Sequence, residues 1–403
     1  MLSRRAPALL ACALLTSGPA PRPAAAAPAS PAPTEVRGLW VIRTALVSPT
    51  EVDRVVDAAA AAGFNALFVQ VRGRGDAFYR STLAPRSPLL ERQPRDFDPL
   101  ARLLARAHVR RLAVHAWVNV LLAAHFGQPL PPGHVLGRHP EWAMVPKSAA
   151  TAALVATGAR RLQLVMEAGR AEGDVEGYYL SPSVPAVGSH LEAVVRELVG
   201  AYAVDGLHLD FVRYPGPSYD HSLSALQGFH TPARGELLGA PARDPAGWDA
   251  YRREVLTRLV ARLGDAARTA RPGLLVSAAV TPDEAQAVHH KGQDWPHWLD
   301  SRLVAVVCPM AYTSEERVFQ QQLEAARARA GDGQRVWAGI GAYRLDPEEL
   351  VERVLLARQA GSGGVVVFSH ESLEPEHLRR LREEAFSPRP GQRDGVAHGA
   401  GSR

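Results

Sequence analysis

Eight apolar segments of strand length alternate along the chain with segments that have the composition and period of amphipathic helices. The expected strands cover residues 38–43, 66–72, 111–120, 205–210, 274–281, 303–312, 335–343 and 363–369. The expected helices cover about 49–62, 99–110, 189–203, 247–270, 294–301, 315–330, 346–360 and 374–385. This alternation indicates a parallel sheet, and eight such units favour a closed barrel over an open, doubly wound sheet. No glycine-rich phosphate-binding turn follows the first strand, which argues against a dinucleotide-binding fold. We therefore expect an α/β fold, a single-domain (β/α)8 TIM barrel over residues 35–385.

The two ends of the chain differ in composition from the expected barrel. Residues 1–27 combine Arg4 and Arg5, an apolar run and a cluster of alanines, which is the pattern of a signal peptide. Cys12 loosely matches a lipoprotein cleavage box, so a lipid anchor there is a lesser alternative. Residues 28–34 are expected to form a linker, and 386–403 a disordered tail. No other stretch is long and apolar enough for a membrane helix. The protein is thus predicted to be exported to the periplasm, the cell envelope or the extracellular space.

The formal net charge of +5 comes from these ends. Residues 1–27 contain three arginines and no acid, and the tail contains three arginines and one aspartate, so the expected barrel is neutral. A neutral barrel gives no support for nucleic-acid binding. Beyond Cys12 the only cysteine is Cys308, which is expected to be a buried, inert thiol.

The stretch from Asp205 to Pro215 has the strongest functional pattern. His208 and Asp210 fall on one face of the expected strand, and Pro215 cannot continue a central strand. The carboxyl ends of the strands are where TIM barrels place their active sites. Asp210 is therefore the first candidate for a catalytic carboxylate.

Polar and aromatic residues also gather at the other strand ends. This mixture suits sugars, since aromatic faces contact the ring and polar groups bind its hydroxyls. Glycosidic bond hydrolysis commonly uses two carboxyl groups; candidates for the second are Asp76, Asp283, Glu315 and Glu371. Long connections at 121–188 and 214–246 are expected to shape substrate binding. The expected substrate-binding residues are Trp40, Arg43, Gln70, Arg72, His115, Trp117, Asn119, His208, Arg213, Tyr214, Tyr312 and Tyr343.

An ordered set of short motifs resembles the glycosyl-hydrolase-like 10 family of bacterial envelope proteins, from about residue 35 to 375. The motifs are Arg37-Gly-Leu-Trp40, Gly63-Phe-Asn-Ala-Leu-Phe-Val-Gln-Val-Arg72 with Gly75-Asp76, Val114-His-Ala-Trp117 with Asn119, His139-Pro-Glu-Trp142, Asp205-Gly-Leu-His-Leu-Asp210 with Arg213-Tyr-Pro215, Cys308-Pro-Met-Ala-Tyr312 and Gly339-Ile-Gly-Ala-Tyr343. The resemblance implies a TIM barrel, export, and action on a polysaccharide, with peptidoglycan glycan strands a leading candidate. The chain departs from the family pattern at two positions. At Phe211 many relatives carry a second aspartate, and at Ser181 they carry aspartate or asparagine before proline.

The resulting hypothesis is a secreted glycoside hydrolase in which Asp210 acts with Asp283, or as second choice Asp76. No metal or organic cofactor is expected, because acid/base sugar chemistry requires none. One alternative is a glycan-binding barrel without catalysis, motivated by Phe211. Another is a metal-dependent hydrolase or deacetylase that uses His115 and His208.

Overall fold

The computed structural model describes residues 35–230 and 236–387. The predicted signal peptide, Cys12, the predicted linker and residues 388–403 of the predicted tail lie outside this part of the chain.

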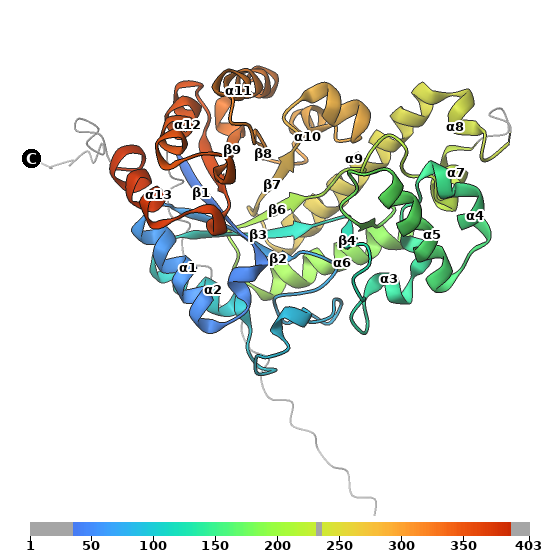
Figure 1. Cartoon of the computed structure of the whole chain (residues 1–403), viewed down its shortest axis with the longest axis horizontal. Coiled ribbons are helices and arrows are strands. Elements are labelled where there is room, and N and C mark those ends of the chain that lie inside the picture. The colour runs from blue at the N-terminus through green and yellow to red at the C-terminus, as the bar shows by residue number, and fades with distance from the viewer. Residues whose placement is uncertain (1–34, 231–235, 388–403) are drawn as a thin grey trace, which may run out of the picture. The chain divides into compact units, whose positions relative to one another are not determined.

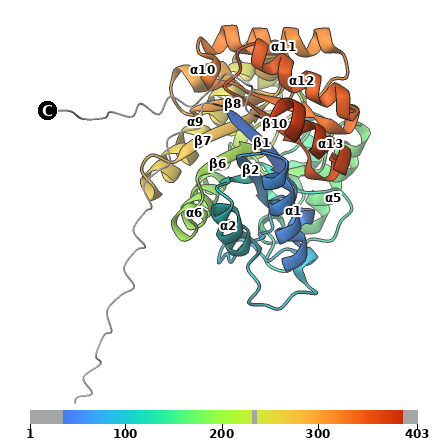
Figure 2. The same cartoon turned by 90° about the vertical axis from the view of Figure 1, so that its left-hand side faces the viewer.

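Eight parallel strands form one sheet, which confirms the predicted TIM-barrel fold (Figures 1 and 2). They are β1 (Val36–Val41), β2 (Ala66–Arg72), β3 (Ala113–Asn119), β6 (Gly206–Asp210), β7 (Leu275–Val280), β8 (Val306–Pro309), β9 (Trp337–Gly341) and β10 (Gly364–Phe368). Their order is β8-β7-β6-β3-β2-β1-β10-β9. Two isolated parallel bridges, Val307 with Val336 and Met310 with Gly339, join the β8 and β9 edges and bring the sheet close to a closed barrel.

Eight helices follow the strands and pack around them (Figure 2). They are α1 (Pro49–Ala61), α2 (Pro99–Val109), α6 (Pro185–Ala201), α9 (Pro245–Ala270), α10 (Trp295–Asp300), α11 (Glu316–Ala330), α12 (Pro347–Gln359) and α13 (Pro375–Arg380). Several of these helices begin at a pair of residues that can be recognised in the sequence. The pair is a capping Ser or Asp followed by proline at the first helical position. Such caps precede α1, α2, α9 and α12, and each cap side chain accepts a backbone N–H of the first turn.

The barrel has two apolar cores. The larger lies between the strands and the surrounding helices. The smaller fills the barrel interior and includes Trp40, Phe68, Trp117 and Trp337. Cys308 belongs to this interior core as a buried free thiol. Interior packing of this kind closes the barrel below its mouth, so a ligand has to enter at one end.

Two long insertions follow neighbouring strands, β3 and β6, on the right of Figure 1. The first contains β4 (Leu122–Ala124), α3 (Val135–Arg138), α4 (Ala150–Val155), α5 (Gly158–Ala171) and β5 (Tyr178–Tyr179). β4 and β5 form a separate antiparallel pair. The second contains α7 (Leu223–Phe229) and α8 (Ala240–Arg243). In the described residues no helix has the length and apolar character needed to cross a membrane.

Phe386 is the last large side chain of the packed barrel, one residue beyond its predicted boundary. It is 5% exposed, meets the Phe64 ring edge-on at 5.2 Å between centroids, and lies under the Arg37 guanidinium. We expect a chain ending after Ala385 to be destabilised by about 3 kcal/mol relative to one ending after Ser387, since a buried phenylalanine is lost. Urea denaturation of the two truncations would measure this difference; equal midpoints would show that Phe386 contributes no packing energy.

Candidate active site

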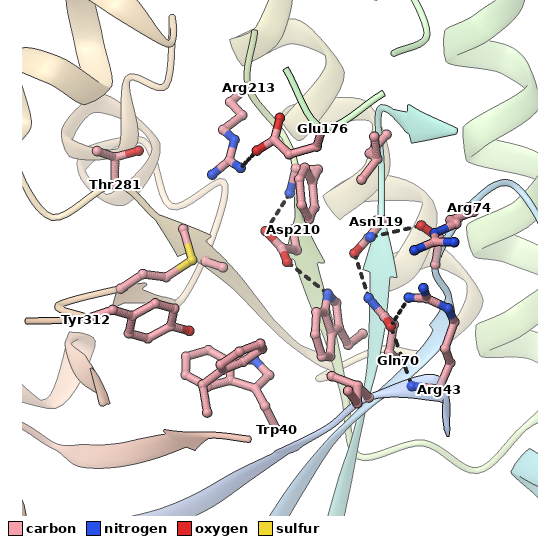
Figure 3. A pocket seen from close by; sticks show the side chains of 18 of the residues that line it. Trp40, Arg43, Gln70, Arg74, Asn119, Glu176, Asp210, Arg213, Thr281 and Tyr312 are labelled. Atoms are coloured by element: carbon pink, nitrogen blue, oxygen red, sulfur yellow. Dashed lines mark hydrogen bonds and ion pairs between the residues drawn. The ribbon is translucent and has the colours of Figure 1, made fainter. Parts of the chain in front are cut away.

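A pocket of about 650 Å³ opens at the carboxyl ends of the strands (Figure 3). Its walls come from seven of the eight strand ends and from the first insertion. The predicted site residues that line it are Trp40, Arg43, Gln70, Trp117, Asn119, Asp210, Arg213 and Tyr312. The strand register explains why they meet, because Asn119 of β3 lies beside Asp210 of β6, and Trp117 beside His208.

Asp210 ends β6 at the centre of the pocket (Figure 3). One carboxylate oxygen accepts the Trp117 indole N–H at 3.0 Å, and the other accepts the Phe211 backbone N–H at 2.6 Å. Burial raises the pKa of Asp210, and the nearby Glu176 raises it further, against the opposing effects of Arg213 and the two hydrogen bonds. The pKa of Asp210 is raised on balance, so its carboxyl group tends to keep its proton.

The chain turns sharply after Asp210. Phe211 has a φ of +52°, a left-handed backbone conformation that residues other than glycine rarely adopt. The Arg213 guanidinium lies over the Phe211 ring, 4.6 Å from its centroid. The turn thus carries Arg213 back over the pocket, and such conformations are typical of functional sites.

Glu176, which is not among the residues predicted from the sequence, is the other carboxylate that lines the pocket. It accepts hydrogen bonds from Arg213 at 2.8 Å and from the Tyr179 hydroxyl at 2.6 Å. Burial alone would raise the pKa of Glu176, but the Arg213 charge and the Tyr179 hydrogen bond outweigh it, so the pKa lies below its ordinary value. The pKa values of the two carboxyl groups, Glu176 and Asp210, are therefore shifted in opposite directions.

Glu176 reaches the barrel mouth because β5 begins two residues after it and pairs with β4. Gly177 permits this approach, since a Cβ at that position would lie 2.0 Å from the Ala124 carbonyl oxygen. The first insertion contains several acidic residues, and Glu176 is distinguished only by the Gly-Tyr-Tyr that follows it and contains the short strand β5.

The four candidates for a second carboxylate lie outside the pocket lining. Asp283 is exposed and accepts the Gln286 backbone N–H. Asp76 is buried beneath the wall and accepts the Arg74 backbone N–H, so it holds the loop after β2. Glu371 bonds Thr44, and both Glu371 and Glu315 are exposed. Among the residues that the structure describes, Glu176 and Asp210 are the two carboxyl groups that line the pocket.

Several predicted substrate-binding residues support the pocket instead of lining it. Arg72 is fully buried and donates to the Asn119 carbonyl oxygen at 2.6 Å. Tyr214 is fully buried under the Arg252 guanidinium. Tyr343 stands 51% exposed beyond the lining and meets Tyr312 edge-on.

His208 lies below the pocket floor. It accepts the Trp40 indole N–H at 3.2 Å, because an indole can only donate. Its other ring nitrogen therefore carries the proton and donates to Ser277 Oγ at 2.9 Å. Burial lowers the pKa of His208 to about 3, so the ring is neutral and fixes Trp40 in place.

His115 lies deeper and stacks on Phe68 at 4.5 Å between centroids. Burial lowers the pKa of His115 to about 4. Both nitrogens of His208 are already engaged, so the two histidines do not present a pair of free ligands. Over residues 35–230 and 236–387, no cluster of three His, Cys, Asp or Glu side chains is arranged to hold a metal ion.

The fold and site define a class of protein, a TIM barrel with two carboxyl groups in a polar and aromatic pocket at the strand ends. The chain belongs to the glycosyl hydrolase-like 10 family, whose model matches residues 35–344. The family match confirms the resemblance seen in the motifs.

Two curated relatives share about a quarter of their aligned residues with this chain. Glycosyl hydrolase YngK of Bacillus subtilis is 24% identical over 344 residues, covering 76% of this chain and 60% of YngK. Glycosyl hydrolase DigH of Escherichia coli K12 is 24% identical over 283 residues, covering 62% of this chain and 55% of DigH. The chain therefore spans little more than half the length of these relatives.

Solved structures with a similar fold include glycoside hydrolases. The PgaB (BpsB) glycoside hydrolase domain of Bordetella bronchiseptica superposes with a TM-score of 0.64 at 18% identity, over 88% of this chain and all of that one. The α-L-fucosidase isoenzyme 2 of Paenibacillus thiaminolyticus gives 0.58 at 14% identity, over 87% of this chain and 49% of that chain. At these identities the likeness concerns the fold.

Proposed function

We propose that the protein is a glycoside hydrolase that cleaves a polysaccharide with Asp210 as general acid and Glu176 as nucleophile or base. The observation that carries the proposal is the opposite pKa displacement of the two carboxyl groups in one pocket. One group then holds a proton for the departing sugar oxygen while the other is ionised, which is the division of labour in glycosidases.

Arg213 would keep the two roles distinct. It pairs with Glu176 at 2.8 Å and stabilises its ionised form. Arg213 interacts less strongly with Asp210 than with Glu176, and burial has the largest effect on the pKa of Asp210. Trp40, Trp117 and Tyr312 supply aromatic surface beside the pair, and Gln70 and Asn119 supply amides for sugar hydroxyls.

Peptidoglycan glycan strands are the proposed substrate. The support is the family match, together with the charged, apolar and small-residue pattern of residues 1–27, on which we also propose export to the cell envelope or beyond. Incubation of the protein with purified strands, followed by mass spectrometry of soluble products, tests the proposal. Release of water-added saccharide fragments supports it; intact strands after long incubation, with other glycans equally untouched, would contradict it.

A glycan-binding barrel without catalysis is a second candidate, favoured by Phe211 in place of a second adjacent carboxylate. Glu176 supplies a second carboxyl group to the pocket, so Phe211 is a weaker reason to expect loss of catalysis. Strand binding without product release would support the binding function.

Chelation separates acid/base hydrolysis from the metal-dependent alternative. We expect strand cleavage to keep its full rate in excess EDTA, because Asp210 and Glu176 suffice for the proposed chemistry and His208 has no free ring nitrogen. The rate is compared before and after dialysis against chelator and after adding zinc. Activity that disappears with EDTA and returns with zinc would support the metal-dependent hydrolase or deacetylase.

A further inference from the structure

Two arginines on the β2 side of the pocket lie close together without a carboxylate partner (Figure 3). Arg43 donates to the Gln70 side-chain oxygen at 2.8 Å, and Arg74 donates to the Gln128 side-chain oxygen at 2.7 Å. Both acceptors are neutral amides. Within the described part of the chain, neither guanidinium forms an ion pair.

The surroundings leave this pair with uncompensated positive charge. Asp76 interacts electrostatically with Arg43, Arg74 and the buried Arg72. One carboxylate thus faces three guanidinium groups, and the exposed Glu371 adds only a second interaction with Arg43. Arg43 and Arg74 also repel each other. Two cations held side by side in a partly buried wall favour an anion between them.

The other cations of the pocket lie near carboxylates. Arg213 pairs with Glu176, and Lys291, which donates to the Pro215 carbonyl oxygen, interacts electrostatically with Glu176 and Asp174. Arg43 and Arg74 thus form a separate positively charged stretch of the pocket wall, across the pocket from Thr281 (Figure 3).

The Arg43 side chain is held in place before any ligand binds. Gln70 accepts from Arg43 and donates to Asn119 at 3.4 Å, and Asn119 in turn donates to the Gly73 carbonyl oxygen at 2.9 Å. This chain of hydrogen bonds fixes the direction of both amides. A guanidinium that is already oriented loses less freedom when it binds a planar carboxylate through two N–H groups.

We propose that Arg43 and Arg74 form an anion subsite that binds a carboxylate substituent of the sugar next to the cleaved bond. This inference rests on the proposed glycosidase function and adds a preference to it: acidic glycans over neutral ones of the same backbone. In peptidoglycan strands freed of their stem peptides, the lactyl group of alternate sugars carries such a carboxylate, whereas N-acetylglucosamine oligomers with the same linkage carry none.

The test compares peptide-free glycan strands, here called native, with the same strands after their lactyl carboxyl groups have been reduced to alcohols. We expect wild type to show a kcat/KM about 10- to 100-fold higher for native strands, as a charge-assisted hydrogen-bonded contact would give. In Arg74→Gln and Arg43→Gln this native-to-reduced ratio falls towards one. Arg74→Lys, which keeps the charge but loses the planar fork, should give an intermediate ratio. Arg92→Gln changes the net charge equally at an exposed position outside the pocket and should keep the wild-type ratio.

The outcomes separate the subsite from the glycosidase proposal. Equal cleavage of native and reduced strands by wild type, unchanged in both glutamine variants, would overturn the subsite and leave the glycosidase intact. If wild type cleaves neither, the glycosidase proposal fails, and calorimetric binding of native and reduced strand fragments decides the subsite. A preference for native fragments that Arg74→Gln abolishes supports it, and the absence of any preference refutes it. Thermal melting of each variant verifies that it is folded.

Discussion

Asp210→Asn is expected to lower kcat/KM for glycan cleavage by about a hundred- to ten-thousandfold, because an amide of the same shape cannot deliver a proton to the departing sugar oxygen. Substrate binding should be nearly unchanged, since asparagine keeps an oxygen to accept the Trp117 N–H. The measurement is the initial rate of fragment release from glycan strands, with strand affinity determined separately. A rate within a few fold of wild type would mean that the proton comes from another group.

The same variant should remain fully folded, which makes its inactivity interpretable. Burial raises the folded-state pKa of Asp210 above its unfolded value. Ionised Asp210 therefore destabilises the fold at pH values above that raised pKa, and the penalty disappears at low pH, where the group is protonated in both states. Asparagine removes the penalty but keeps an acceptor for only one of the Trp117 and Phe211 N–H groups, so the melting temperature at neutral pH should stay close to that of wild type. A marked fall would show instead that the carboxylate stabilises the pocket.

Glu176→Gln is expected to lower kcat by at least about a hundredfold, since the neutral amide can act neither as nucleophile nor as base. In the proposed mechanism the active wild-type form has Asp210 protonated and Glu176 ionised. Its kcat/KM should therefore fall as pH rises through the raised pKa of Asp210, and as pH falls through the lowered pKa of Glu176. The expected profile is a bell with its alkaline limb set by Asp210.

The residual activity of Glu176→Gln provides a sharper readout. Glu176 raises the pKa of Asp210 and occupies Arg213. Removing its charge lowers the pKa of Asp210, so the alkaline limb should move to lower pH. Glu167→Gln, on the exposed face of α5 in the same insertion, is the matched control. Asp283→Asn and Asp76→Asn belong in the same series, because a large loss of kcat in one of them, with Glu176→Gln active, would transfer the second role to that residue.

The barrel could be predicted from the sequence because most strands are apolar runs of strand length and several helices begin at a recognisable cap. Asp210 could be predicted for a related reason, since the alternation with His208 and the stop at Pro215 place it at a strand end. Period-two alternation also placed His208 and His115 on the inward face. It could not tell that they lie below the pocket floor, because depth along a barrel depends on the relative register of all its strands.

Glu176 could not be predicted because it comes from an insertion with no strong period. Its position depends on a two-residue strand, β5, and on a close approach at Gly177 that becomes visible only once β4 is placed. Tyr214 was expected to contact substrate because it follows Asp210 closely in the chain. The left-handed turn at Phe211 instead precedes a segment whose Arg213 faces the pocket while Tyr214 packs in the core.

The β4–β5 pair has a consequence for how the site is assembled. Asp210 comes from β6, a central strand of the barrel, and Glu176 comes from the end of the small β4–β5 ribbon outside the barrel. Opening of that ribbon would require the loss of only a few hydrogen bonds, far fewer than unfolding of the barrel. The durability of the proposed enzyme would then be set by the attachment of the ribbon, and two homologues with equally stable barrels could differ widely in how long they stay active.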